Sequence, residues 1–316
     1  MGSPPPIIRD VRVRTVDAPL RRAVRTAVGT IPSAPLVLID VTTEEGVAGR
    51  SYLFAYSRVA LAPLARLVAD IGAECVGRPV APVAQMQAFD GRFRLLGWQG
   101  LVGMAVAGLD MAFWDVLGRA AGCPLAQLLG GLPAALPAYD SFGLVDPAVD
   151  ETAILASVAA GFRAIKIKLG DRDLPHDLAV VQAVRAMIGP DIRLMVDYNQ
   201  ALPPAEAVRR ITRLSVFALD WVEEPARAED SAGHARVRAA SPVPVQTGEN
   251  WWFPQAMADF LRAGACDYAM LDVMKIGGVT GWLRAAALAQ AASLPVSSHI
   301  FPETSAHLLA VTPTAH

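Results

Sequence analysis

Cysteine is scarce in this sequence, and charges of one sign do not cluster. The three cysteines, Cys75, Cys123 and Cys266, are odd in number and far apart, which argues against a disulfide framework and against a CxxC metal site. The 28 basic and 30 acidic residues give a formal net charge of −2 and are dispersed along the chain. Neither a nucleic acid nor a membrane surface is therefore the expected partner. We expect a small-molecule ligand and a reducing, cytoplasmic location.

A leader peptide and a membrane span are also not expected. The N-terminal residues MGSPPPIIRD contain neither a positively charged n-region nor an apolar h-region. The most apolar stretch, residues 100–118, is interrupted by Asp110 and Asp115. With 53% hydrophobic and 18% charged residues, the chain can instead bury a large core, as a globular α/β protein does.

The first part of the chain has the pattern of a small antiparallel sheet followed by helices. Apolar and polar residues alternate in the expected strands, and a Glu-Glu-Gly turn separates the second strand from the third. The expected strands are 7–16, 35–49 and 51–56, and the expected helices are 58–75, 82–95 and 99–121. We predict an α+β capping domain over residues 1–132.

From residue 133 onward, apolar strand candidates alternate with helical segments. The expected strands are 135–141, 163–169, 192–199, 218–225, 242–250, 266–273 and 294–301. Such alternation predicts right-handed βαβ units and a parallel sheet. We therefore predict a (β/α)8-type TIM barrel over residues 133–316, in which an eighth strand is not apparent.

A polar residue stands at or near the end of six of these strands, about one βα unit apart. The six residues are Lys168, Asp197, Glu223, Glu249, Asp272 and His299. In a barrel the carboxyl ends of the strands converge on one mouth, where active sites are built. We expect the six side chains to meet there.

Three of these residues predict a magnesium site. Asp197, Glu223 and Glu249 follow three consecutive strands, and three converging carboxylates repel one another unless a cation lies between them. Mg²⁺ takes oxygen ligands and leaves coordination positions for a substrate. The alternative is that each acid is only a helix cap or a solvated loop residue.

The remaining residues predict two bases. Lys166 and Lys168 lie on one strand face, and adjacent ammonium groups lower each other's pKa, as a general base requires. His299 has Asp272 on the neighbouring strand to orient it. The alternatives are a lysine that extends to solvent and an ordinary structural histidine. Because the two strands lie on opposite sides of the mouth, the pair favours racemisation through a dianionic enediolate, whose charge the metal and Lys166 would meet.

At these residues the sequence resembles the mandelate racemase/muconate lactonizing enzyme family of the enolase superfamily. The motifs that carry the resemblance are TAVGT, APLVLID, SYLFAY, AYDS, IKIKLG, MVDYNQ, EEP, GENW, MKIGGVTGW, SSH and SAHLLAVTPTAH. The resemblance implies that Lys168 is the base for the S face and His299, with Asp272, the base for the R face. It also implies Mg²⁺ ligands at Asp197, Glu223 and Glu249.

The resemblance implies further contacts around the substrate. Lys166 would contact the substrate carboxylate, Asn199 and Ser141 would contact other polar groups, and Lys275 would be a charge near the carboxylate ligands. The family's mobile loop corresponds to residues 21–31. The expected apolar pocket residues are Val24, Val28, Ile31, Tyr56 and Ile300, although each is also an ordinary core residue type. An apolar pocket suits an aryl group.

Two features depart from the family pattern. Arg21, Arg22 and Arg25 make the loop basic, which leaves room for a substrate with additional polar or anionic groups. In the family, TPTAH is followed by a glutamate on the eighth strand that binds the substrate carboxylate, whereas this chain ends at His316. We expect that the sequence is truncated and that this strand and glutamate follow.

The leading hypothesis is a Mg²⁺-dependent racemase of mandelate or a related aryl 2-hydroxy carboxylate. An acid-sugar dehydratase of the same superfamily is the alternative, and a non-catalytic truncated remnant is the alternative of another class. The resemblance also implies a homo-oligomer, commonly an octamer.

Overall fold

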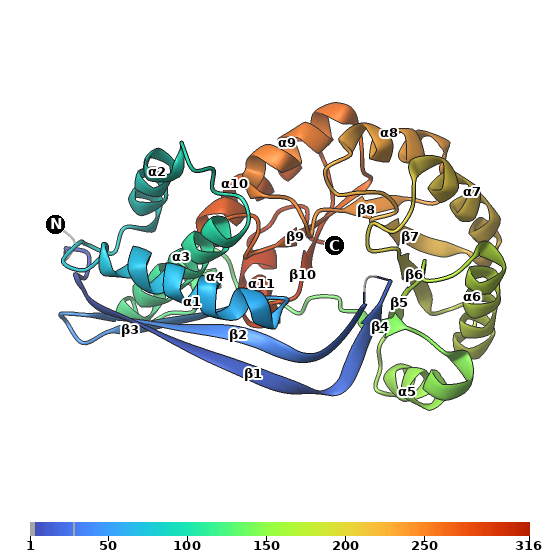
Figure 1. Cartoon of the computed structure of the whole chain (residues 1–316), viewed down its shortest axis with the longest axis horizontal. Coiled ribbons are helices and arrows are strands. Elements are labelled where there is room, and N and C mark those ends of the chain that lie inside the picture. Colours follow the sequence, from blue (N-terminus) through green and yellow to red (C-terminus); the bar gives the residue numbers. More distant parts are fainter. Residues whose placement is uncertain (1–3, 28) are drawn as a thin grey trace.

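The computed structural model describes residues 4–27 and 29–316. The N-terminal domain is a three-stranded antiparallel sheet in the order β1-β2-β3, covered by helices (Figure 1). Its elements are β1 (Ile8–Thr26), β2 (Gly29–Thr43), β3 (Ala48–Phe54), α1 (Arg58–Ala73), α2 (Pro82–Phe93), α3 (Leu101–Ala120) and α4 (Leu125–Leu128). The expected capping domain of strands followed by helices is confirmed.

Helix α3 is the central helix of this domain. It is long and apolar enough to cross a membrane, but 72% of its apolar window is buried inside the protein. At Gly108 the helix lies so close to the sheet that an added Cβ would come within 2.6 Å of Ile39 and 2.9 Å of Leu53. Its hydrophobicity therefore serves helix-on-sheet packing.

The segment 21–31 is not the loop that the sequence predicts. Residues up to Thr26 belong to β1 and residues from Gly29 belong to β2, so the segment forms the paired arms of a long hairpin. The pairing resumes at Val24 and Ile31 after a register shift. Figure 1 shows this hairpin running from the cap to β4 of the second domain.

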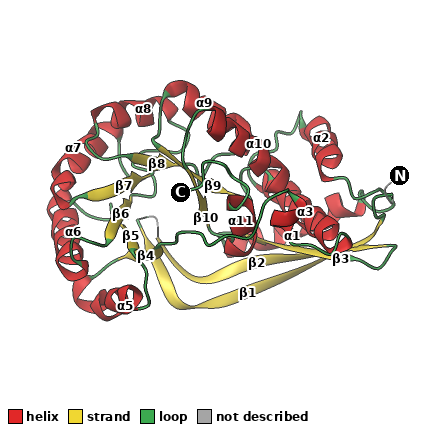
Figure 2. Ribbon diagram, turned by 180° about the vertical axis from the view of Figure 1, so that it is seen from behind, coloured by secondary structure: helices red, strands yellow, loops and turns green. Residues whose placement is uncertain are grey.

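The second domain is a seven-stranded parallel sheet with helices on its outer face (Figure 2). The strands are β4 (Asp140–Leu144), β5 (Ala164–Lys168), β6 (Arg193–Asp197), β7 (Leu219–Glu223), β8 (Val245–Thr247), β9 (Tyr268–Asp272) and β10 (Val296–His299). The helices are α5 (Pro147–Ala159), α6 (Leu174–Ile188), α7 (Pro204–Leu214), η1 (Ser215–Phe217), α8 (Ser231–Ala240), α9 (Phe253–Ala263), α10 (Gly278–Ala291) and α11 (Pro302–Leu309).

The sheet is a partial TIM barrel, as the sequence predicts. Within the described residues its order is β10-β9-β8-β7-β6-β5-β4, and β4 and β10 are its two edges. Beside β10, Ala315 forms an isolated parallel bridge with Val296. The predicted first strand of this sheet, residues 135–141, begins too early. Residues 135–139 are irregular, and β4 begins at Asp140. Pro137 lies in that irregular segment, and proline cannot donate to a sheet.

Proline and aspartate begin the outer helices. Five of them, α5, α6, α7, α9 and α11, have proline in the first turn, where its fixed φ and missing N–H are tolerated. The carboxylates of Asp146, Asp173 and Asp230 accept backbone N–H groups at the starts of α5, α6 and α8. These signals mark the starts of all the α-helices named above for this domain except α10, which begins after Gly277.

Candidate active site

The six polar residues predicted at strand ends all lie at the carboxyl edge of the parallel sheet. Five of them are the last residue of their strand: Lys168 of β5, Asp197 of β6, Glu223 of β7, Asp272 of β9 and His299 of β10. Glu249 lies two residues beyond β8. In the register of the sheet, Lys168 is level with Asp197, Asp197 with Glu223, and Asp272 with His299.

The three predicted metal ligands meet below the mouth. One carboxylate oxygen from each of Asp197, Glu223 and Glu249 lies within 4.8 Å of the other two, and all three residues are buried. Burial, opposed by Lys166 but reinforced by the other two acids, raises the pKa of Glu223 to about 7. An all-oxygen set of buried acids that repel one another fits a hard divalent cation such as Mg²⁺.

The two lysines of β5 face these acids. Lys166 Nζ donates to both oxygens of Glu223, at 2.6 and 2.7 Å, and Lys168 Nζ donates to Asp197 Oδ2. Burial opposes the charge of Lys166, but attraction to Glu223 and the other nearby anionic groups raises its pKa well above the usual value. Asp197 is also buried, yet the lysines lower its pKa. The expectation that the two lysines lower each other's pKa is wrong for Lys166, because each lysine pairs with a carboxylate. The role of Lys168 as a base stays a prediction.

His299 is held by Asp272, as the sequence predicts. Asp272 Oδ2 lies 2.7 Å from His299 Nδ1, and Asp272 Oδ1 accepts the backbone N–H groups of Met274 and Lys275. This arrangement places the other ring nitrogen, Nε2, toward the mouth, 3.3 Å from Glu249. Burial lowers the pKa of His299, but Glu249 and Asp272 outweigh it and raise the pKa above the usual value.

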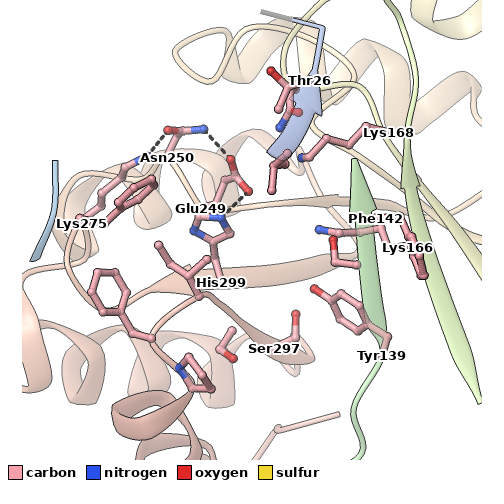
Figure 3. A pocket seen from close by; sticks show the side chains of 18 of the residues that line it. Thr26, Tyr139, Phe142, Lys166, Lys168, Glu249, Asn250, Lys275, Ser297 and His299 are labelled. Carbon is pink, nitrogen blue, oxygen red and sulfur yellow. Dashed lines mark hydrogen bonds and ion pairs between the residues drawn. The ribbon is translucent and has the colours of Figure 1, made fainter. Parts of the chain in front are cut away.

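The lysines and the histidine enter the mouth from different sides. Four strands separate β5 from β10 in the sheet. Figure 3 shows Lys166 and Lys168 on one side of the pocket and His299 across from them. A substrate carbon between them can exchange protons with either side.

The predicted polar substrate contacts also lie at the mouth. Asn199, at a left-handed φ of 42°, donates from its backbone and its amide to Asp197. Its Oδ1 is buried and has no partner among residues 4–27 and 29–316, so it is free to accept a hydrogen bond from a ligand hydroxyl. Ser141 is level with Lys166 in the sheet and lines the same cavity.

The mouth opens into a cavity of about 990 Å³ with a largely apolar wall. Val24, Ile31, Tyr56 and Ile300 line it, as predicted, whereas Val28 lies outside the described residues. Apolar residues that the sequence reasoning did not single out add to the same wall: Leu20, Leu36, Phe54 and Phe301. The antiparallel pairing of β1, β2 and β3 therefore brings much of this surface from the cap.

The arginines of the hairpin do not line this cavity in the part of the chain that the structure describes. The Arg22 guanidinium lies 4.6 Å from the centre of the Phe142 ring, and Arg25 pairs with Asp150 at 2.9 Å. Arg21 is exposed. The expectation that these charges leave room for an anionic substrate group is not supported, because two of them attach the hairpin to the barrel domain.

Four further polar or aromatic residues of the site were not singled out from the sequence: Tyr139, Glu224, Gln246 and Asn250. Gln246 Nε2 donates to Glu223, and the Tyr139 ring centre lies 5.3 Å from Lys166 Nζ. The amide of Asn250 donates to both oxygens of Glu224, at 2.7 and 2.9 Å. A compositional signal was available for Asn250. The sequence holds three lysines, Lys166, Lys168 and Lys275, and two asparagines, Asn199 and Asn250, and all five line the cavity.

Comparison with known families matches both halves of the chain. Residues 8–130 match the model described as mandelate racemase / muconate lactonizing enzyme, N-terminal domain. Residues 150–316 match the model described as enolase C-terminal domain-like. The chain is 31% identical over 288 residues to the 3,6-anhydro-alpha-L-galactonate cycloisomerase of Streptomyces coelicolor, covering 90% of this chain and 80% of that protein. It is 33% identical over 272 residues to the D-galactarolactone cycloisomerase of Agrobacterium fabrum, covering 84% and 71%.

Solved structures share the fold and bind magnesium. An enolase from Bradyrhizobium, complexed with magnesium and mandelic acid, is 57% identical and superposes with a TM-score of 0.96 over 100% of this chain and 88% of that one. A racemase from Streptomyces coelicolor with bound magnesium is 29% identical, with a TM-score of 0.94 over 98% and 88%. Mg²⁺ in these relatives agrees with the buried acids Asp197, Glu223 and Glu249.

Proposed function

We propose that this chain, which belongs to the mandelate racemase/muconate lactonizing enzyme family of the enolase superfamily, is a racemase of an aryl 2-hydroxy carboxylate such as mandelate. The family and the buried acids make it a magnesium-dependent enzyme that acts through enolisation. The observation that carries the proposal is the placement of two proton-transfer groups, Lys168 and the His299–Asp272 pair, across one cavity.

The proposed reaction uses these groups in turn. One base, Lys168 Nζ or His299 Nε2, takes the proton from the carbon next to the carboxylate, and the opposite group returns a proton to the other face. Asp272 holds the His299 ring so that Nε2 faces the substrate. Lys166 and Asn199 would bind the substrate carboxylate and hydroxyl. Magnesium, when bound to the three acids, supplies positive charge that stabilises the enediolate.

The apolar wall of the cavity favours a substrate with an aryl group. Apolar side chains from the cap hairpin and from Ile300 form much of the lining, and such a wall favours a ring over a polyhydroxylated chain. The Bradyrhizobium enolase that is 57% identical was crystallised with mandelic acid.

Proton exchange tests the proposal directly. In heavy water with Mg²⁺, the protein should incorporate deuterium at the α-carbon of both mandelate enantiomers and interconvert them. His299→Asn should keep exchange from (S)-mandelate and lose racemisation, and Lys168→Ala should keep exchange from (R)-mandelate and lose racemisation. The proposal is contradicted if neither enantiomer exchanges its α-proton in folded protein with magnesium bound. Loss of both exchanges in both variants contradicts the two-base assignment.

An acid-sugar dehydratase is the second candidate. Two observations favour it: the polar side chain of Gln200 in the lining of the cavity, and a 31% identity over 221 residues to the L-talarate/galactarate dehydratase of Salmonella typhimurium. A keto acid product, detected with semicarbazide across a panel of acid sugars, would decide for it. A non-catalytic protein would give neither product. Cytoplasmic location and homo-oligomerisation stay predictions.

A further inference from the structure

Lys275 is a buried cation that differs from the other two lysines of the site. It lies just after β9, lines the cavity and is 7% exposed. Lys166 and Lys168 each pair with a carboxylate. Within residues 4–27 and 29–316, no carboxylate oxygen lies within 4.0 Å of the Lys275 ammonium, and its one hydrogen bond is to Asn250 Oδ1. Two of its three N–H donors thus remain available.

Asn250 and Tyr56 set the direction of this ammonium. The carbonyl end of the Asn250 amide accepts from Lys275, while its NH₂ end donates to Glu224 and, at 3.4 Å, to Glu249. The amide is therefore bonded to the ammonium at one end and to acids at the other, and Figure 3 shows it between Lys275 and Glu249. On its other side, Lys275 Nζ lies 4.7 Å from the centre of the Tyr56 ring. Lys275 is itself one of the residues that line the cavity.

A buried ammonium without a counter-ion is unfavourable unless an anion joins it. One neutral acceptor and an aromatic face compensate only part of the lost hydration. We propose that Lys275, aimed by Asn250 and Tyr56, binds an oxyanion of the ligand. The inference rests on the proposed function only in taking this cavity as the substrate site, and it makes Lys275 a ligand-binding residue where the sequence predicts a charge near the metal ligands.

The oxyanion has two possible sources that share one chemistry. One is the carboxylate next to the reacting carbon, and the other is a second carboxylate at the distal end of the ligand. Three probes separate them: mandelate, its amide (mandelamide), and 4-carboxymandelate. Binding of each to the magnesium-loaded full chain is measured by calorimetry, which is independent of turnover.

In the first variant, Lys275→Met, the apolar stem is kept and the charge is removed. We expect the ligand whose carboxylate Lys275 contacts to bind about tenfold more weakly or worse, as truncation of one partner of a buried charged contact does, while mandelamide binding changes less than about twofold. If mandelate and 4-carboxymandelate lose the same factor of affinity in Lys275→Met, Lys275 contacts the α-carboxylate. If only 4-carboxymandelate loses affinity, Lys275 contacts the distal carboxylate.

Two further variants keep the test decisive. Asn250→Leu retains the lysine but removes its carbonyl partner, and we expect a smaller loss of affinity for the same ligand with the same indifference to mandelamide. Arg227→Met removes an exposed positive charge from the same cavity and should weaken mandelate less than about twofold, because solvent screens that charge.

Three results overturn the inference. The first is unchanged affinity for both acids in folded Lys275→Met, and the second is a loss of affinity for mandelamide in that variant as large as the loss for the acids. The third is a loss of affinity for the acids in Arg227→Met as large as in Lys275→Met. Failure of the proposed function is a separate observation. It is seen in the wild-type protein as absence of α-proton exchange, whatever the calorimetry of Lys275→Met gives.

Discussion

Gly143 is where the cap hairpin meets the barrel domain, and replacing it with alanine should move the hairpin away from the mouth. The residue lies in β4, at an irregularity of its pairing with β5 between Ser141 and Leu144. A Cβ added there would come within 2.5 Å of the carbonyl oxygen of Arg25 and 2.8 Å of its nitrogen. Both atoms are backbone, so no side chain can rotate to make room.

The size of the effect follows from the contacts next to Gly143. Ordinary contact begins near 3.4 Å, so the hairpin must shift by about 1 Å. That shift weakens the Arg25–Asp150 ion pair, in which the arginine is about half exposed, and the stacking of Arg22 on Phe142. Each contact is worth about 0.5–1 kcal/mol. Their combined loss of about 1–2 kcal/mol lowers the docked population five- to thirtyfold.

Two assays report the displacement. The Michaelis constant for α-proton exchange with mandelate should rise by about five- to thirtyfold, because binding then has to restore the docked hairpin. The turnover number should change less, because the atoms nearest to the added Cβ belong to the backbone of Arg25 in the hairpin and not to Lys168 or His299. Trypsin should also cleave after Arg21, Arg22 and Arg25 faster than in the wild type, since β1 is less protected.

Gly91→Ala is the matched control. Gly91 is an exposed residue of α2, and an added Cβ there meets nothing within 4 Å. Alanine should stabilise that helix by about 0.5–1 kcal/mol and leave the Michaelis constant and trypsin cleavage unchanged. Wild-type values of both quantities in folded Gly143→Ala would refute the reasoning, because they would mean that the hairpin need not dock at Gly143 for the substrate to bind.

Two other predictions concern buried acids. Glu223→Gln removes a metal ligand and the counter-ion of Lys166. Calorimetry should show Mg²⁺ binding about 100-fold more weakly or worse, and the free energy of unfolding in urea should fall by about 3 kcal/mol. A wild-type affinity for Mg²⁺ would rule out Glu223 as a ligand. Burial, opposed by hydrogen bonds from Thr280, raises the pKa of Asp110 from 3.8 to about 7. Its stabilising contribution is therefore complete below pH 4 and is lost as pH rises through 7, at most by about 4 kcal/mol; Asp110→Asn should flatten that part of the stability profile, and an unchanged profile would contradict the assignment.

The barrel was predictable because its signals are local and repeated. Most units carry an apolar strand, a polar residue at or near the strand end and a proline or aspartate at the next helix start, and periodic patterns of this kind determine element type well. The predicted loop at 21–31 was wrong for the opposite reason. Its strand character depends on pairing across the hairpin and on contacts with Gly143 and Phe142, which lie more than a hundred residues away in the sequence.

The candidate site shows the same division. Asp197, Glu223 and Glu249 could be placed together because parallel strands end at one edge. The role of Asn250 could not be predicted, because it depends on the hydrogen-bond acceptor taken by Lys275, which lies 25 residues further along the chain. The Lys275 ammonium donates to the carbonyl end of the Asn250 amide, and the NH₂ end of the same amide donates to Glu224. The ammonium also lies 4.7 Å from the ring centre of Tyr56, which belongs to the other domain.

The cap and the barrel thus contribute different properties to one cavity. The barrel strands supply the charged groups, and these bond to one another: Lys166 to Glu223, Lys168 to Asp197 and His299 to Asp272. The cap supplies much of the apolar wall, and its hairpin is attached through Arg22, Arg25 and the backbone beside Gly143, none of which is a predicted catalytic residue. Substitutions on the inner face of the hairpin can therefore change the shape of the ligand pocket while Lys168, His299 and the buried acids keep their geometry.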